Sequence, residues 1–378
     1  MSSDKSDGQG SNSTSTAGAY ALAEILSQPQ CWEACLKLLD GASVAQEVTG
    51  MFPDAEEWLF IGCGSSYYVA LAAAAYWNQI TRSRARAIPA SELLLFPDLI
   101  LINGKKCCPV LISRSGRTSE VLKAAEYLQS KSIRSIAITC APGQPLENLA
   151  TRTICLSPAD ERSTVMTRSF TSMLLAIQYL AAKVSKQDKE ADDLRGLPQA
   201  GDKFLSSLPR RVREFVRAHQ FADYICLGQG PFFGLACESA LKLTEMSVSY
   251  GQNFHTLEFR HGPKSVVGPE TLLLFLLSET GYESECEVLE EMKRLGATTL
   301  VVANKADARA HRAADFLVEL GMDLPEFTRL APYVFTGQLM GLYTGLKKGL
   351  DPDHPRHLSR VVILDDEASS ETTEHAEL

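Results

Sequence analysis

A pattern that occurs twice limits the fold of this chain more than any other feature of its sequence. WLFIGCGSSYYVALAAAAYW begins at Trp58 and YICLGQGPFFGLACESALKL begins at Tyr224. In each, an apolar run meets a Gly-x-Gly turn and continues as a helical stretch. At nearly the same offset, LISRSGRTSEVLKAAEYL from Leu111 is matched by FLLSETGYESECEVLEEM from Phe275, and SIAIT is matched by TLVVAN. Three strand-then-helix units in the same order indicate a duplicated domain.

Short β-branched runs that alternate with helical patterns are typical of βαβ units, whose right-handed crossovers place helices on both faces of a parallel sheet. We therefore predict two tandem doubly wound parallel-sheet domains of the flavodoxin-like, three-layer α/β/α type. The predicted segments are a disordered tail (1–18), a first domain (45–195), a second domain (215–350), and a C-terminal segment with an acidic tail (351–378). The charged, proline-containing stretch KQDKEADDLRGLPQAGDK is the predicted linker.

Composition excludes several classes of protein. A net charge of −9 argues against binding to a nucleic-acid backbone, and no apolar run is long enough for a membrane helix. The N-terminal stretch has no apolar secretory core, so we expect a cytoplasmic protein without nucleic-acid or membrane partners. The ten cysteines form no C-x-x-C pair and no zinc-like cluster with histidine, which predicts reduced core thiols and no metal site.

The loop SRSGRTSE gathers the hydroxyls of Ser113, Ser115, Thr118 and Ser119 around Gly116, directly after an apolar run. Ligands of doubly wound sheets bind beyond the carboxyl ends of the strands, where both this loop and GCGSS are expected. A helix N-terminus there offers N–H groups and partial positive charge, which suit a phosphate. The sequence therefore predicts a phosphate cup in the first domain.

Two observations qualify this prediction. A hydroxyl before a helix is often only an N-cap, and neither Gly-x-Gly turn completes a dinucleotide motif. The second-domain counterpart, SETGYES, carries Glu279 where the first domain has Arg114, which disfavours an anion. Only the first copy is therefore predicted to bind phosphate.

A polar stripe follows the second Gly-x-Gly turn. Glu238, Lys242 and Glu245 stand at positions i, i+4 and i+7 of CESALKLTEMS, on one helical face. A solvated ion pair explains such a face, but at the ligand edge of a sheet a carboxylate beside an ammonium could also act as a base. Further along, His261 directly precedes a Gly-Pro turn in EFRHGPKS, where it is either a surface residue or part of the site.

Taken together, CGSS, SRSGRT, ESALKLTE, EFRHGP and GLDPDHPRHLSR resemble the sugar-isomerase (SIS) superfamily over about residues 20–362. The resemblance is to the isomerase half of glucosamine-6-phosphate synthase and to stand-alone amino-sugar-phosphate deaminases and tagatose-6-phosphate isomerases. It implies two tandem SIS domains. It also implies that sugar-phosphate binding involves Ser65, Ser66, Ser113, Arg114, Ser115, Gly116, Thr118 and Arg360.

The resemblance also implies catalytic roles. Glu245 would move a proton between C1 and C2 of the open-chain sugar, with Lys242 and Glu238 beside it on the same helix. His261 would open the sugar ring from the adjacent subunit of a homodimer with shared sites. A group that titrates near neutrality suits ring opening, and a carboxylate along the C1–C2 edge suits the proton transfer. No metal or organic cofactor is implied.

Two departures limit the resemblance. Arg360 stands where the synthase has an imine-forming lysine, and an arginine stays protonated. Met166 replaces a serine near the sugar. In addition to these departures, no glutaminase half is expected, so glutamine is not the expected amide donor. The stand-alone deaminases and isomerases are the more similar relatives in these respects.

The leading prediction is a sugar-phosphate isomerase or deaminase that acts on a hexosamine or ketohexose 6-phosphate by ring opening and C1–C2 proton transfer. The alternatives are a non-catalytic sugar-phosphate-binding regulator and a deglycase of a phosphorylated sugar–amine adduct. A regulator needs the phosphate cup but has no use for Glu245 and His261. The sequence does not identify the sugar, and it leaves deamination, isomerisation, deglycation and ammonia-dependent synthesis open.

Overall fold

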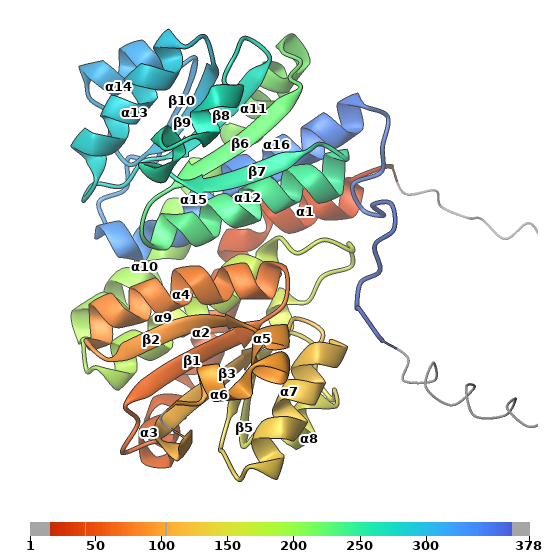
Figure 1. Cartoon of the computed structure of the whole chain (residues 1–378), viewed down its shortest axis with the longest axis vertical. Helices are drawn as coiled ribbons and strands as arrows, with labels where there is room; N and C mark the ends of the chain where they lie inside the picture. Colours follow the sequence, from red (N-terminus) through yellow and green to blue (C-terminus); the bar gives the residue numbers. More distant parts are fainter. Residues whose placement is uncertain (1–15, 42, 103, 365–378) are drawn as a thin grey trace, which may run out of the picture.

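The computed structural model describes residues 16–41, 43–102 and 104–364, which form two α/β lobes stacked along the long axis (Figure 1). The predicted disordered and acidic tails therefore fall mainly outside the described residues. Gly18 is an exception, because its N–H donates to Asp351 Oδ1 at 2.9 Å. No helix within the described ranges is both long and apolar enough to span a bilayer.

Each lobe contains a five-stranded sheet in which every pairing is parallel. The strand order is β2-β1-β3-β4-β5 in the first sheet and β10-β9-β8-β6-β7 in the second, so both sheets have the same topology. This arrangement confirms the predicted pair of doubly wound domains. The strands are β1 Glu57–Gly62, β2 Arg84–Pro89, β3 Cys107–Ile112, β4 Ile136–Thr139, β5 Arg152–Cys155, β6 Asp223–Gly228, β7 Gly251–His255, β8 Thr271–Leu276, β9 Thr298–Ala303 and β10 Phe316–Glu319.

Helices cover both faces of each sheet. In the first half of the chain they are α1 Ala19–Leu26, α2 Gln28–Asp40, α3 Val44–Met51, α4 Ser65–Thr81, α5 Ala90–Leu95, α6 Pro97–Ile100, α7 Ser119–Ser130, α8 Leu146–Leu149 and α9 Arg168–Val184. In the second half they are α10 Asp188–Leu205, α11 Leu208–Ala218, α12 Pro231–Ser247, α13 Tyr282–Arg294, α14 Ala308–Ala313, α15 Leu330–Tyr333 and α16 Phe335–Lys347. Short 3₁₀ turns are η1 Gly104–Lys106, η2 Ser157–Ala159, η3 Glu258–Arg260, η4 Pro263–Val266 and η5 Glu326–Arg329.

The predicted linker forms helix α10, which packs against α2 and α9. Ala191, Leu194 and Leu197 are buried on one face of this helix, while its charged residues lie on the other. The high charge of the stretch concealed this apolar period, and Pro198 is accommodated inside the helix. The domain boundaries themselves stay predictions.

Helix α12 lies side by side with α4 of the first lobe and with α16 of its own lobe (Figure 1). Two glycines permit these close approaches. A Cβ on Gly234 would lie 2.7 Å from the backbone N of Ala72 in α4, and one on Gly341 would lie 2.6 Å from the carbonyl oxygen of Lys242. The helix that carries the polar stripe is therefore fixed in the centre of the molecule, between the two sheets.

Candidate active site

A pocket of about 640 Å³, including its open mouth, lies where the carboxyl edge of the first sheet meets α12. Its walls come from the β1–α4 turn, the β3–α7 loop, the loop before α9, helix α12 and the C-terminal segment. The lining residues are Cys63, Gly64, Ser65, Ser66, Arg114, Ser115, Thr118, Thr164, Met166, Glu245, Ser359, Arg360, Val361 and Val362.

Two of the predicted residues, Ser113 and Gly116, stabilise the β3–α7 loop without lining the pocket. Ser113 is buried, and its Oγ accepts the Gly116 N–H at 3.2 Å and lies 3.2 Å from Thr118 Oγ1. Gly116 has a φ of 62°, and a Cβ there would lie 2.8 Å from Gln144 Cβ, so glycine is required. Ser113 and Gly116 thus hold the turn, while Ser115 and Thr118 line the pocket.

The start of α7 tests the alternative that these hydroxyls are ordinary helix caps. Thr118 occupies the N-cap position of α7 but makes no side-chain capping bond. Ser119 Oγ accepts the Leu364 N–H at 2.9 Å, and the Ser119 N–H donates to the Val362 carbonyl at 3.2 Å. The cap interpretation therefore does not account for these hydroxyls. The C-terminal segment, however, already occupies the Ser119 N–H at the start of α7, which was expected to be open to a ligand.

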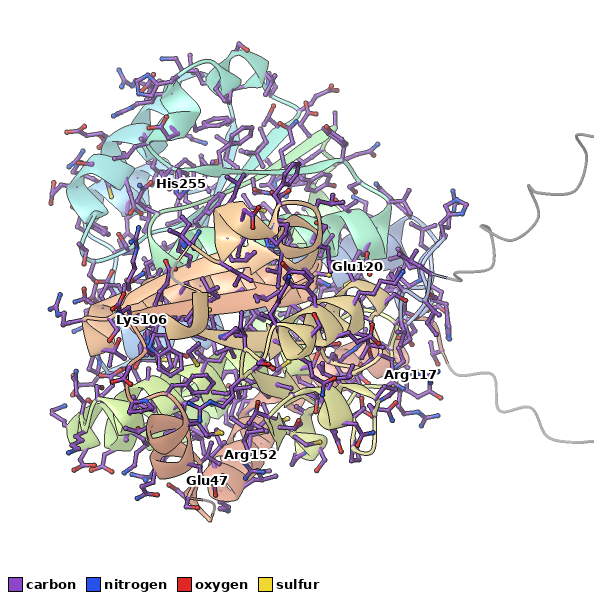
Figure 2. The ribbon with its side chains drawn as sticks, turned by 60° about the horizontal axis from the view of Figure 1, so that its bottom comes forward. Glu47, Lys106, Arg117, Glu120, Arg152 and His255 are labelled. Atoms are coloured by element: carbon purple, nitrogen blue, oxygen red, sulfur yellow. The ribbon has the colours of Figure 1, made fainter. Side chains whose placement is uncertain are left out.

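Arg114 lines the pocket and is bonded mainly to acceptors of the protein itself. Its guanidinium is buried and lies 3.4 Å from a Glu161 carboxylate oxygen. It also donates to the carbonyl oxygens of Thr164 at 2.9 Å, Val165 at 3.2 Å and Arg360 at 2.8 Å. These protein acceptors occupy its donors, so Arg114 joins two walls of the pocket. Arg117, by contrast, is exposed at the edge of the molecule (Figure 2).

The C-terminal segment forms one wall of the pocket, and of its lining residues only one was predicted from sequence. Arg360 was predicted at the site and does line it, but its guanidinium pairs with Asp160. Val361 and Val362, which also line the pocket, are ordinary aliphatic residues in a short irregular stretch. No local pattern marks such residues, because their position depends on contacts with distant parts of the chain.

The polar stripe of α12 is a buried ion-pair chain rather than a solvated face. The Lys242 ammonium is fully buried, lies 3.2 Å from Glu238, pairs with Glu245, and donates to Ser65 Oγ at 3.3 Å. Burial raises the pKa of Glu238 to about 7, although the Lys242 charge opposes this shift. For Lys242, burial acts to lower the pKa, but the two carboxylates outweigh it and raise the pKa. Of the three residues, Glu245 is the one that reaches the pocket.

His261 is exposed and does not line the pocket of its own chain. Arg260 and Lys264, on either side of it, both pair with Glu291 of α13, at 2.8 and 2.7 Å. These pairs anchor the loop to the second lobe. The stretch before it begins as strand β7, which ends at His255, pairs with β6 and lies at the edge of the second sheet.

The matching loop of the second lobe is filled by the protein's own carboxylates. Glu326 accepts the backbone N–H groups of Glu279 at 2.6 Å and Thr280 at 3.2 Å. Glu285 accepts both the N–H and the hydroxyl of Ser278, at 3.0 and 2.6 Å, and burial raises its pKa to about 7. Carboxylates of the protein itself therefore occupy the donors of this loop, and anion binding by the first copy alone stays a prediction.

Within the described ranges no group of three histidine, cysteine, aspartate or glutamate side chains is arranged to hold a metal ion. All ten cysteines lie in those ranges, and each is free of a disulfide. Cys63 alone among them lines the pocket, and burial raises the pKa of its thiol to about 11, which disfavours a thiolate nucleophile.

Comparisons with known proteins agree with this architecture. The SIS domain family matches residues 51–183. The crystal structure of glucosamine-6-phosphate deaminase from Thermotoga maritima is 30% identical to this chain, with a TM-score of 0.75, over 91% of this chain and 100% of that one. Tagatose-6-phosphate ketose/aldose isomerase from Escherichia coli has the same fold, with 22% identity and a TM-score of 0.78, over 94% and 99% of the two chains.

Among curated proteins, the glutamine–fructose-6-phosphate aminotransferase of Helicobacter pylori is 26% identical over 363 residues, which cover 92% of this chain. That match covers 59% of the aminotransferase, and a second aminotransferase, from Pyrobaculum aerophilum, is also covered over 59% of its length. The chain thus spans little more than half the length of these relatives.

The hydroxyls of the pocket give the first prediction. Thr118→Val keeps the side-chain shape but removes a donor, and a hydrogen bond to a charged group contributes about 1.5–3 kcal/mol. Calorimetry should therefore show sugar 6-phosphate binding weakened roughly ten- to a hundredfold for Thr118→Val, and likewise for Ser115→Ala. Ser130→Ala, at the exposed far end of α7, is the control. Unchanged dissociation constants for both pocket variants would contradict the phosphate cup.

Proposed function

The chain belongs to the SIS (sugar isomerase) family, and on that premise we propose that it is an aldose–ketose isomerase or amino-sugar-phosphate deaminase. Its proposed substrate is a hexosamine or ketohexose 6-phosphate. The observation that carries the proposal is one pocket in which Ser115 and Thr118 of the first lobe face the same space as Glu245 of the second. A phosphate held at one end would leave the carbon chain of the sugar directed toward the carboxylate.

Glu245 has the surroundings that a base in this reaction needs. Its carboxylate is 18% exposed, and the buried Lys242 ammonium holds it in place on α12. In the proposed step the ionised carboxylate removes the proton from C2 of an open-chain aldose and returns it to C1. The intermediate is an enediol, or an enolamine when C2 carries an amino group. An amino sugar then gives an imine at C2, and water hydrolyses this imine to a ketose 6-phosphate and ammonia.

Ring opening must come before this proton transfer. We propose that His261 of a second subunit supplies it, because His261 is exposed and outside the pocket of its own chain. Imidazole can donate and accept a proton near neutral pH, as opening of a hemiacetal requires. The proposed partner is therefore a second copy of the chain, in a twofold dimer with two shared sites.

The aminotransferase activity of the curated relatives is not part of this proposal. The chain spans 59% of their length, and Arg360, at the position of the imine-forming lysine, is paired with Asp160. A permanently protonated guanidinium does not form an imine readily. The solved deaminase, which the chain covers over its whole length, favours release of ammonia as the net reaction. A cytoplasmic location is proposed because ten free cysteines suit a reducing compartment.

Glu245→Gln tests whether the pocket is catalytic. The amide keeps the size and polarity of the side chain but removes the base, so turnover should fall by about 10²–10⁴-fold while sugar phosphate still binds. Turnover is measured on a panel of hexose and hexosamine 6-phosphates, with ammonia and ketose followed separately. Glu33→Gln, which opens the exposed Glu33–Lys37 pair, is the matched control. Full activity of Glu245→Gln would mean that Glu245 is only structural. Binding by the wild-type protein without any turnover would favour the regulatory alternative.

Shared sites give a prediction about mixed subunits. Glu245→Gln and His261→Asn should each be inactive, but a mixed dimer would contain one site with both groups intact. After subunit exchange, random pairing makes half the dimers mixed, so activity should recover to about a quarter of the wild-type value. A mixture that exchanges subunits and stays inactive, or an active monomer, would rule out the shared site.

A further inference from the structure

Helix α1 precedes both repeated lobes, and its amino end is held by the C-terminal segment. Asp353 is 1% exposed, and its carboxylate accepts the N–H groups of Tyr20 at 3.0 Å and Ala21 at 2.7 Å. Asp351 accepts the Gly18 N–H at 2.9 Å. A carboxylate at this position satisfies N–H groups that have no partner within the helix and complements the positive end of the helix dipole. The residues from Asp351 onward are thereby tied to α1.

The middle of the same helix holds a second segment. Glu24 is 4% exposed, and its carboxylate accepts the N–H groups of Arg162 at 2.5 Å and Ser163 at 3.3 Å, together with the Ser163 hydroxyl. The next residue, Thr164, donates its N–H to the Asp353 carbonyl at 3.1 Å. Helix α1 therefore contacts the loop before α9 and the C-terminal segment at once, and these two segments also contact each other.

Both segments are walls of the pocket. Thr164 and Met166 line it from the loop, and residues 359–362 line it from the C-terminal segment. Arg114 joins the two walls on the pocket side, through the carbonyl oxygens of Thr164 and Arg360. Neither wall belongs to a strand or helix, and these polar contacts join the two walls to each other and to α1.

We propose that α1 positions the two irregular walls of the pocket, with Asp353 and Glu24 as positioning residues for sugar-phosphate binding. The proposal rests on the proposed function for its ligand, but the coupling of the two walls through α1 stands on the contacts alone. Because α1 touches both walls, loss of either carboxylate loosens both of them. A purely structural role would instead lower stability and leave the walls and the ligand affinity unchanged.

The test uses the full chain with Asp353→Asn, Glu24→Gln and the control Glu285→Gln. Glu285 is a matched control, because it is also buried and also accepts the N–H and hydroxyl of one serine, but in the second lobe and away from the pocket. Hydrogen–deuterium exchange is measured without ligand for α1 and for residues 160–167 and 355–364. Thermal unfolding and the KM and kcat for the sugar 6-phosphate that the wild-type protein turns over are measured for the same variants.

Asp353→Asn and Glu24→Gln should each exchange faster in both wall segments, 160–167 and 355–364. KM should rise roughly tenfold while kcat changes much less, because the walls act on binding. Glu285→Gln should lower the unfolding temperature without either effect. Faster exchange confined to α1, or to one wall only, would overturn the coupling, and so would a KM that rises equally in Glu285→Gln. If the wild-type protein turns over no sugar phosphate, the proposed function fails, while the exchange measurement still decides the role of α1.

Discussion

The site depends on the ion pairs that the buried Lys242 ammonium makes. A fully buried cation needs charged partners, and it has Glu238 at 3.2 Å, Glu245 beside it and Ser65 of the other lobe at 3.3 Å. Breaking a buried ion pair by removing one partner typically costs about 3–5 kcal/mol. Both carboxylates lie on α12 itself, so they neutralise Lys242 within the helix and the pair keeps Glu245 at the pocket, while the bond to Ser65 joins α12 to α4. A base held in this way has few alternative positions to sample.

The two lobes have the same turn geometry but differ in what occupies the loop at the carboxyl edge of each sheet. Gly64 and Gly230 adopt the same conformation, with φ of 54° in both and ψ of −129° and −130°, so the turns before α4 and α12 are equivalent. In the second lobe, Glu326 occupies the backbone donors of the loop after β8. In the first lobe, Ser115 and Thr118 face the open pocket. The first lobe is thus suited to bind an anion, and the second supplies the carboxylate.

The parts of this architecture that could be predicted from sequence are those with a local pattern. The repeated strand–turn–helix units predicted both sheets, and the i, i+4, i+7 spacing placed Lys242 and Glu245 on one face of α12. Contacts across the chain left no such pattern. Asp353 lies more than three hundred residues from the helix end that it caps, and Val362 meets the start of α7 through backbone atoms alone. The contacts of Arg114 left no pattern for the same reason, since most of its acceptors are backbone carbonyl groups that any residue provides.

Movement of a proton between C1 and C2 of a phosphorylated sugar is the central claim, and proton NMR in D₂O tests it most directly. Glucosamine 6-phosphate and fructose 6-phosphate are incubated with the wild-type protein and with Glu245→Gln. The account predicts deuterium at C1 or C2, or conversion of one sugar class into the other, with the wild-type protein and not with Glu245→Gln. Binding of these sugars with neither deuterium at C1 or C2 nor conversion would contradict it and leave a protein that binds sugar phosphates without acting on them.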